Sequence, residues 1–78
     1  MPRGSRAFHP LARDRGEAVT QALRRLPEPF REAVVLRDLE GLAYGEIARV
    51  LGIRIGTVRS RIARGRDRLR TLLESSES

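Results

Sequence analysis

Apolar residues recur at helical spacing along most of the chain, and no segment alternates between polar and apolar residues as a strand would. A first helix is predicted to begin near Asp14, with Glu17 three residues on in a capping-box-like pair, and to end at Pro27. Its apolar residues follow the i, i+3, i+4, i+7 spacing: Val19, Ala22, Leu23 and Leu26. This spacing predicts one buried stripe.

A second helix is predicted to open at Pro29, which the first helical turn tolerates because its N–H groups lack helical partners. Gly41 is its predicted C-terminal stop. Its apolar residues surround most of the helix: Phe30, Ala33, Val34, Val35, Leu36 and Leu39. A helix that is apolar on most sides is typical of the interior, so we expect this segment to be the central element of the core.

Two more helices are predicted, a short one over residues 44–51 and a longer one from about 55 to 73. The short helix directs three apolar residues inward: Ile47, Ala48 and Leu51. The expected fold is an all-α four-helix bundle over residues 14–73, with a helix-turn-helix at its C-terminal end. Residues 1–13, with the tag-like "PRGS", are expected to be an expression-tag remnant or a disordered leader, and residues 74–78 a frayed polar tail.

The helix-turn-helix is predicted from three residues, Ala48, Gly52 and Val58. Two helices that cross steeply over a short turn need a small residue where their backbones meet. They also need a residue tolerant of positive φ in the turn and an apolar anchor early in the second helix. The surrounding apolar contacts are supplied by Ile47, Leu51, Ile53 and Ile62. The same spacing also occurs in helical corners that bind no nucleic acid, so that alternative stays open at this point.

A helical wheel of the last predicted helix separates three kinds of surface. One side is apolar and contains Val58, Ile62, Gly65, Leu69, Leu72 and Leu73. The opposite side, here called the small-residue strip, contains Gly56, Ser60, Ala63 and Asp67. Between them run a first arginine row, Arg59, Arg66 and Arg70, and a second arginine row, Arg61, Arg64 and Arg68. A low strip between two cationic rows is complementary to the DNA major groove, where base edges lie between two phosphate walls.

The arginine rows also have a purely structural interpretation, because charged residues on a helix are often a solvated face. Arg61 and Arg68 border the apolar side, where either is placed to pair with Glu40 or Glu46 instead of DNA. The carboxylate of Asp67 would repel phosphate, so we expect it to bond an arginine three positions away. That arginine is Arg64 or Arg70.

Two other residues have competing explanations. Gly65 costs about 1 kcal/mol in a helix interior, and close packing of a neighbouring helix explains it best. Tyr44 is either a residue at the edge of the core or the donor of a hydroxyl hydrogen bond to a phosphate.

Composition narrows the possible functions. The sixteen basic residues are all arginine and the net charge is +6, which favours a polyanionic partner, with nucleic acid first. The chain contains no cysteine, and its one histidine, His9, has no second ligand nearby, so neither a disulfide nor a metal site is expected. Thr57 and Ser60 have no histidine within reach, so no catalytic activity or cofactor is expected. No apolar stretch is long enough to span a membrane, which predicts a soluble cytoplasmic protein.

The segment from about residue 17 to 73 resembles region 4 of bacterial sigma factors of the extracytoplasmic-function group. The motifs that carry the resemblance are "LP", "VLRDLEGL", "EIARVLGI" and "GTVRSRIARGRDRLR", in the order and spacing of that family. The resemblance implies a monomeric promoter-recognition module that binds the −35 element of double-stranded DNA. It also implies docking on the β flap of core RNA polymerase and masking by an anti-sigma factor.

Carried over position by position, the resemblance also implies the residues that touch DNA. The expected base-reading residues are Arg59, Ser60, Ala63 and Arg64. The expected phosphate contacts are Tyr44, Arg54, Thr57 and Arg66.

The chain departs from the family pattern at three positions. Ala63 stands where many members have a bulkier histidine or phenylalanine, which reduces one base contact to a methyl group. Arg54 occupies a turn position that is often proline, and Gly45 one that is commonly acidic. Nothing in the chain resembles region 2 of a sigma factor, so we expect it to be an excised C-terminal domain.

Other functions are compatible with parts of the pattern. A helix-turn-helix of the response-regulator type has a similar layout but forms dimers. A module that acts mainly as the binding partner of an anti-sigma factor would use the same basic helix. A helix lying on a membrane surface fits less well, because the apolar side of the last helix has no Trp or Phe to insert.

Overall fold

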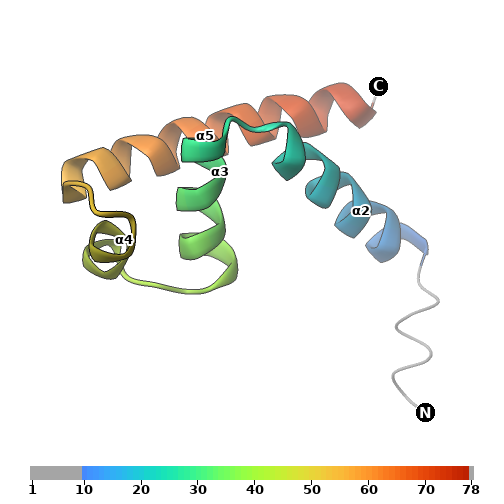
Figure 1. Ribbon diagram of the computed structural model, residues 1–78. Coiled ribbons are helices and arrows are strands. Elements are labelled where there is room, and N and C mark those ends of the chain that lie inside the picture. Colours follow the sequence, from blue (N-terminus) through green and yellow to red (C-terminus); the bar gives the residue numbers. More distant parts are fainter. Residues whose placement is uncertain (1–9, 78) are drawn as a thin grey trace, which may run out of the picture.

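The computed structural model describes the backbone of residues 10–77 and the side chains of residues 16–75. Over this part of the chain there are four α-helices, a π-helical segment and no strand (Figure 1), which confirms the all-α prediction. The elements are α2 (Pro10–Arg25), α3 (Glu28–Val34), the π-helix η1 (Val35–Leu39), α4 (Tyr44–Leu51) and α5 (Ile55–Glu77). The prediction for the leader, including His9, lies largely outside the described residues.

The longest helix, α5, is the element against which the others pack. Figure 1 shows α4 near the N-terminal end of α5, α3 crossing its middle and α2 beside its C-terminal half. The helix-turn-helix therefore occupies one end of the molecule, and α2 and α3 support the other part of α5.

The core lies where α3, α4 and α5 meet. It is centred on a cluster of four fully buried residues: Ala33, Ile47, Val58 and Ile62. Partly buried residues pack around this cluster: Leu36, Leu42, Tyr44, Ala48, Leu51 and Ile53. Burial of an isoleucine or valine side chain contributes about 1.5–3 kcal/mol, so these few residues fix how α4 and α5 cross. The apolar stripe predicted for α2 is also confirmed, since Ala22 and Leu26 are buried.

Gly65 lies at the crossing of α3 and α5. A Cβ atom built at this position would lie 2.6 Å from Val34 Cγ2 and 3.2 Å from the Phe30 carbonyl oxygen. The missing side chain therefore lets the two helices approach closely, which confirms that packing explains this glycine.

The second predicted helix ends differently from the prediction. After Val34 it widens into η1, where the Glu40 N–H donates to the Val35 carbonyl over 3.0 Å. Each turn of a π-helix holds an extra residue, so side chains after the transition are rotated away from the α-helical stripe. Leu39 is accordingly 65% exposed, and its prediction as a core residue is wrong. Gly41 then adopts a φ of 76°, as expected of a residue that stops a helix.

The outer ends of the first and last helices also differ from prediction. α2 begins at Pro10 instead of near Asp14, so Asp14 lies inside the helix and its predicted cap with Glu17 is wrong. Proline is favourable at a first helical position, where its fixed φ suits the helix and no N–H is needed. α5 continues past Leu73 to Glu77, a stretch with no glycine or proline to stop it.

Candidate nucleic-acid interface

The turn between α4 and α5 is built around Gly52. This residue has φ 68° and ψ 38°, and its N–H donates to the Ala48 carbonyl. The same carbonyl accepts a second hydrogen bond from the Ile53 N–H over 3.0 Å. A left-handed glycine with these two bonds closes a helix end, and Val58, fully buried, anchors the helix that follows. Gly52 thus has the positive φ, and Val58 the burial, that their predicted places require. The structural roles of Ala48, Gly52 and Val58 in a helix-turn-helix stay a prediction.

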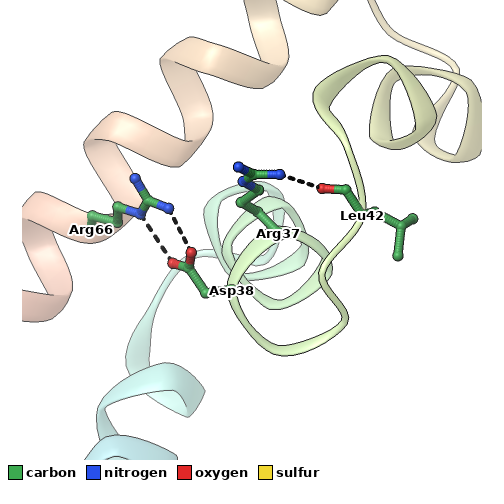
Figure 2. Close-up of polar contacts among 4 residues, drawn as sticks. All are labelled: Arg37, Asp38, Leu42 and Arg66. Carbon is green, nitrogen blue, oxygen red and sulfur yellow. Dashed lines mark hydrogen bonds and ion pairs between the residues drawn. The ribbon is translucent and has the colours of Figure 1, made fainter.

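Two side chains fix the start of α4. The Ala43 N–H donates to Glu46 Oε1 over 2.8 Å, which satisfies one of the free N–H groups at this end. Arg37 Nη1 donates to the Leu42 carbonyl over 2.9 Å, as Figure 2 shows, and its guanidinium lies 5.0 Å from the centre of the Tyr44 ring. The Tyr44 ring packs against the core cluster while part of it stays exposed. Its role at the core edge is confirmed, and its phosphate contact stays a prediction.

The two sides of α5 are divided as the helical wheel predicted. On the apolar side Val58, Ile62 and Gly65 are buried, and the other predicted members are half-buried: Leu69, Leu72 and Leu73. The whole small-residue strip is exposed: Gly56, Ser60, Ala63 and Asp67. The strip is therefore outside the bundle and accessible to a partner.

The arginines of the turn and the first part of α5 have no partner within the described residues. Arg54, Arg59 and Arg64 are exposed and Arg61 is half-buried. None of the four side chains makes a hydrogen bond, ion pair or ring contact with the described side chains or backbone of residues 16–75. The expected base-reading residues, Arg59, Ser60, Ala63 and Arg64, share this exposed and unneutralised surface.

Two of the expected phosphate contacts lie at the start of α5. Arg54 lies in the turn, and its carbonyl accepts a hydrogen bond from the Val58 N–H over 3.1 Å. Thr57 lies in the first turn of the helix and is half-buried. Both residues therefore lie where a helix N-terminus favours a negative charge.

Farther along α5 each arginine has a partner within the protein. Arg66 Nε donates to Asp38 Oδ2 over 3.0 Å, and its Nη2 donates to Asp38 Oδ1 (Figure 2). Arg68 lies over the Phe30 ring, 5.3 Å from its centre, and Arg70 donates to Asp67. The Asp67–Arg70 pair was one of the two predicted pairings.

The predicted pairing of Arg61 or Arg68 with Glu40 or Glu46 is wrong. The Glu46 carboxylate instead accepts the N–H at the start of α4, and Arg68 contacts an aromatic ring. The pairing of Arg66 with Asp38 was missed. These two residues are 28 positions apart, and no local spacing connects them.

The ion pair between Arg66 and Asp38 shifts the pKa of both residues. The hydrogen bonds from Arg66 lower the pKa of Asp38, and the positive charges of Arg66 and Arg37 act in the same direction, against the opposing effect of partial burial. The hydrogen bond to Asp38 likewise raises the pKa of Arg66, with a further contribution from Tyr44. Both groups therefore stay charged at neutral pH.

Other kinds of site are not found in the described part of the chain. No three side chains of the metal-ligating types come together within residues 16–75. None of the helices there combines the length and the apolar character needed to cross a bilayer. A groove of about 350 Å³ is lined by residues of α3, η1 and α4: Arg31, Glu32, Val35, Leu36 and Leu51.

Comparison with known proteins gives a consistent result. The family described as "Sigma-70, region 4" matches residues 16–69. The chain is 54% identical over 63 residues to the ECF RNA polymerase sigma factor SigE of Mycolicibacterium smegmatis, covering 81% of this chain and 24% of that protein. It is 46% identical over 65 residues to the RNA polymerase sigma-H factor of Pseudomonas aeruginosa, covering 82% and 34%. It is 44% identical over 57 residues to the ECF RNA polymerase sigma-E factor of Escherichia coli, covering 73% and 30%. The chain thus spans between a quarter and a third of the length of these relatives.

Proposed function

The chain belongs to the sigma-70 region 4 family, and from this premise we propose that it recognises the −35 element of promoters with α5 in the major groove. The observation that carries the proposal is the exposed small-residue strip of α5, flanked by arginines whose side chains have no partner among the side chains of residues 16–75. An α-helix fits the major groove, and small residues on its leading side let it approach the base edges.

The proposed base-reading residues are Arg59, Ser60, Ala63 and Arg64. Arginine binds the O6 and N7 atoms of guanine with two hydrogen bonds, and serine accepts or donates to several bases. The methyl group of Ala63 suits the C5-methyl of thymine. All four side chains are exposed on about two turns of one helix, which a reading surface requires.

The proposed phosphate contacts are Tyr44, Arg54, Thr57 and Arg66. Tyr44 opens the first helix of the helix-turn-helix, which crosses the DNA backbone in this kind of motif. Arg54 and Thr57 lie at the start of the recognition helix, where backbone N–H groups also favour phosphate. These contacts fix the position of α5 and add affinity on any sequence.

We propose two protein partners, in keeping with the family. The β flap of RNA polymerase would dock on the first helices of the domain. The groove lined by Val35, Leu36 and Leu51, with Arg31 and Glu32 at its α3 side, supports this location. It combines apolar and charged residues of α3, η1 and α4 and contains no residue of the small-residue strip. An anti-sigma factor would cover the arginine rows and compete with DNA. The domain would act in the cytoplasm as a monomer that binds without catalysing a reaction.

The response-regulator alternative is not favoured, because the region 4 family matches residues 16–69, most of the described chain. A single module of this size binds DNA weakly. Tethering to the rest of a sigma factor and to polymerase would supply the effective concentration that makes its contact with the −35 element significant.

The test is a titration of fluorescent −35 and scrambled duplexes at two salt concentrations. Arg59→Ala or Arg64→Ala should weaken binding to the −35 duplex by about 1–3 kcal/mol and binding to the scrambled duplex by much less. Arg54→Ala should weaken binding to both duplexes and lower the salt slope by about one phosphate. Arg24→Ala, which removes one exposed arginine from α2, is the charge-matched control. Equal losses on both duplexes for Arg59→Ala and Arg64→Ala would refute base readout.

A further inference from the structure

The six arginines of α5 fall into two groups by their partners. Among the side chains described, residues 16–75, the first group has none: Arg59, Arg61 and Arg64. The second group is held by other side chains: Arg66, Arg68 and Arg70. Arg66 differs from the others in this second group because its carboxylate partner, Asp38, belongs to a separate element, η1. Asp38 therefore reaches Arg66 because η1 packs near α5, and not because the two residues are close in sequence.

Asp38 lies among groups that would also bind an anion. Its two carboxylate oxygens accept from Nε and Nη2 of Arg66, a two-pronged contact drawn in Figure 2. Arg37 adds positive charge nearby, although its guanidinium points away to the Leu42 carbonyl. The Tyr44 ring lies 5.0 Å from the guanidinium of Arg37, the residue before Asp38. Arg66, one of the proposed phosphate contacts, thus holds a carboxylate in a region that carries further positive charge.

A phosphate can replace the Asp38 carboxylate in this contact without a change in geometry. The guanidinium fork binds carboxylate and phosphate oxygens in the same planar arrangement. The pair is also open to solvent, since the side chains of Arg66 and Asp38 are 49% and 38% exposed. Exposed ion pairs of this kind are weak and exchange partners readily.

We propose that Asp38 competes with a phosphate of the DNA backbone for Arg66. The inference rests on the proposed function, because it concerns how the same surface binds DNA. In the free protein Asp38 occupies the guanidinium of Arg66, and on DNA a phosphodiester replaces it. Because a phosphate contact carries no sequence information, this competition lowers affinity for every duplex to the same extent.

A double-mutant cycle tests the competition. The proteins are the unaltered chain, Asp38→Asn, Arg66→Ala and the double variant, each titrated with the −35 and scrambled duplexes by fluorescence anisotropy. Asp38→Asn should raise the affinity about twofold to fivefold on both duplexes when Arg66 is present, since it removes the competing charge. In the Arg66→Ala background the same change should have less than half of that effect. Arg66→Ala should also lower the salt slope by about 0.9, the contribution of one phosphate.

Glu40→Gln is the matched control, because Glu40 is exposed, lies two residues from Asp38 and carries the same charge. It should raise affinity by less than twofold, and equally with and without Arg66. Thermal unfolding of each variant checks that the helices remain folded, and Asp38→Ala, which removes both oxygens, should reproduce the result of Asp38→Asn.

Two results would overturn the inference while leaving the proposed function intact. An equal gain from Asp38→Asn in both backgrounds would mean general charge repulsion, and a loss of affinity would mean that Asp38 only positions α5. Failure of the unaltered chain to prefer the −35 duplex, with no loss from Arg59→Ala, would refute base readout but leave the phosphate competition measurable on any duplex. Absence of DNA binding altogether would overturn both.

Discussion

The two halves of α5 carry the same residue type and use it differently. Residues 55–64 present Arg59, Arg61 and Arg64 without partners in the described chain, beside an exposed strip of small residues. From Gly65 onward the helix packs against α3 and α2. The arginines of this half contact Asp38, Phe30 and Asp67. Positive charge counted from a sequence is therefore larger than the charge available to DNA. The fold decides how much of it is available.

The largest expected effect comes from removing the packing that joins the two halves. Ile62 is 1% exposed in the core cluster, one position before the exposed Ala63. Ile62→Ala should lower the free energy of unfolding by about 2–5 kcal/mol, because it leaves a cavity among closely packed side chains. Chemical denaturation measures the loss. Ser60→Ala, on the exposed strip, should change stability by less than about 0.5 kcal/mol, and a similar loss there would contradict the division of α5.

A smaller effect is expected at the boundary between the halves. In Gly65→Ala the new Cβ would clash with Val34 and the Phe30 backbone, which overrides the gain in helix propensity. The free energy of unfolding should fall by about 1–2 kcal/mol. Gly45→Ala is the control, since a Cβ there meets no atom within 4 Å, and it should be neutral or stabilise by up to about 1 kcal/mol. Thermal melts that rank the two variants in the opposite order would refute close packing at Gly65.

A weaker effect is expected from the pair at the far end of the arginine rows. Arg70→Ala breaks an exposed pair with Asp67, so it should change stability by less than about 1 kcal/mol. It should weaken DNA binding less than Arg64→Ala, because Asp67 already neutralises Arg70. A titration of both variants with the same duplex tests this. Equal losses of DNA affinity would mean that pairing with Asp67 does not reduce the contribution of Arg70 to DNA binding.

The smallest expected effect is a dependence of stability on pH. The folded state lowers the pKa of Asp38, chiefly through its hydrogen bond with Arg66, so the pair stabilises the fold above about pH 4. This contribution should be lost as the pH falls through the lowered pKa. The stability difference between the unaltered chain and Asp38→Asn should therefore be constant near neutral pH and shrink in acid. A difference that grows below pH 4 would contradict the shift.

The sequence predicted what depends on nearby residues. The stripe that buries Ala22 and Leu26, the left-handed turn at Gly52 and the two sides of α5 all follow from spacings within a few turns of helix. The Asp67–Arg70 pair belongs to the same class, since its residues are three positions apart.

What the sequence did not predict depends on distant contacts or on a change of helix type. The pairing of Arg66 with Asp38 follows from the crossing of α5 and η1, which no local pattern encodes. Leu39 was misplaced because an α-helical period was assumed through a segment that is a π-helix. The predicted start of the first helix at Asp14 and the predicted end of the last helix at Leu73 were wrong. No residue near either position prevents the helix from extending further. The assignment of individual arginines to bases or phosphates stays a prediction.

The wide turn of η1 sets the direction of one carboxylate through the way that the backbone is wound. A π-helix advances by fewer degrees per residue than an α-helix, so Asp38 points in a different direction from the one that unbroken α-helical winding after Val34 would give it. Ala33 and Val34 precede the turn and lie in the core. The winding of a single turn thus decides where this carboxylate meets Arg66, without any change in charge.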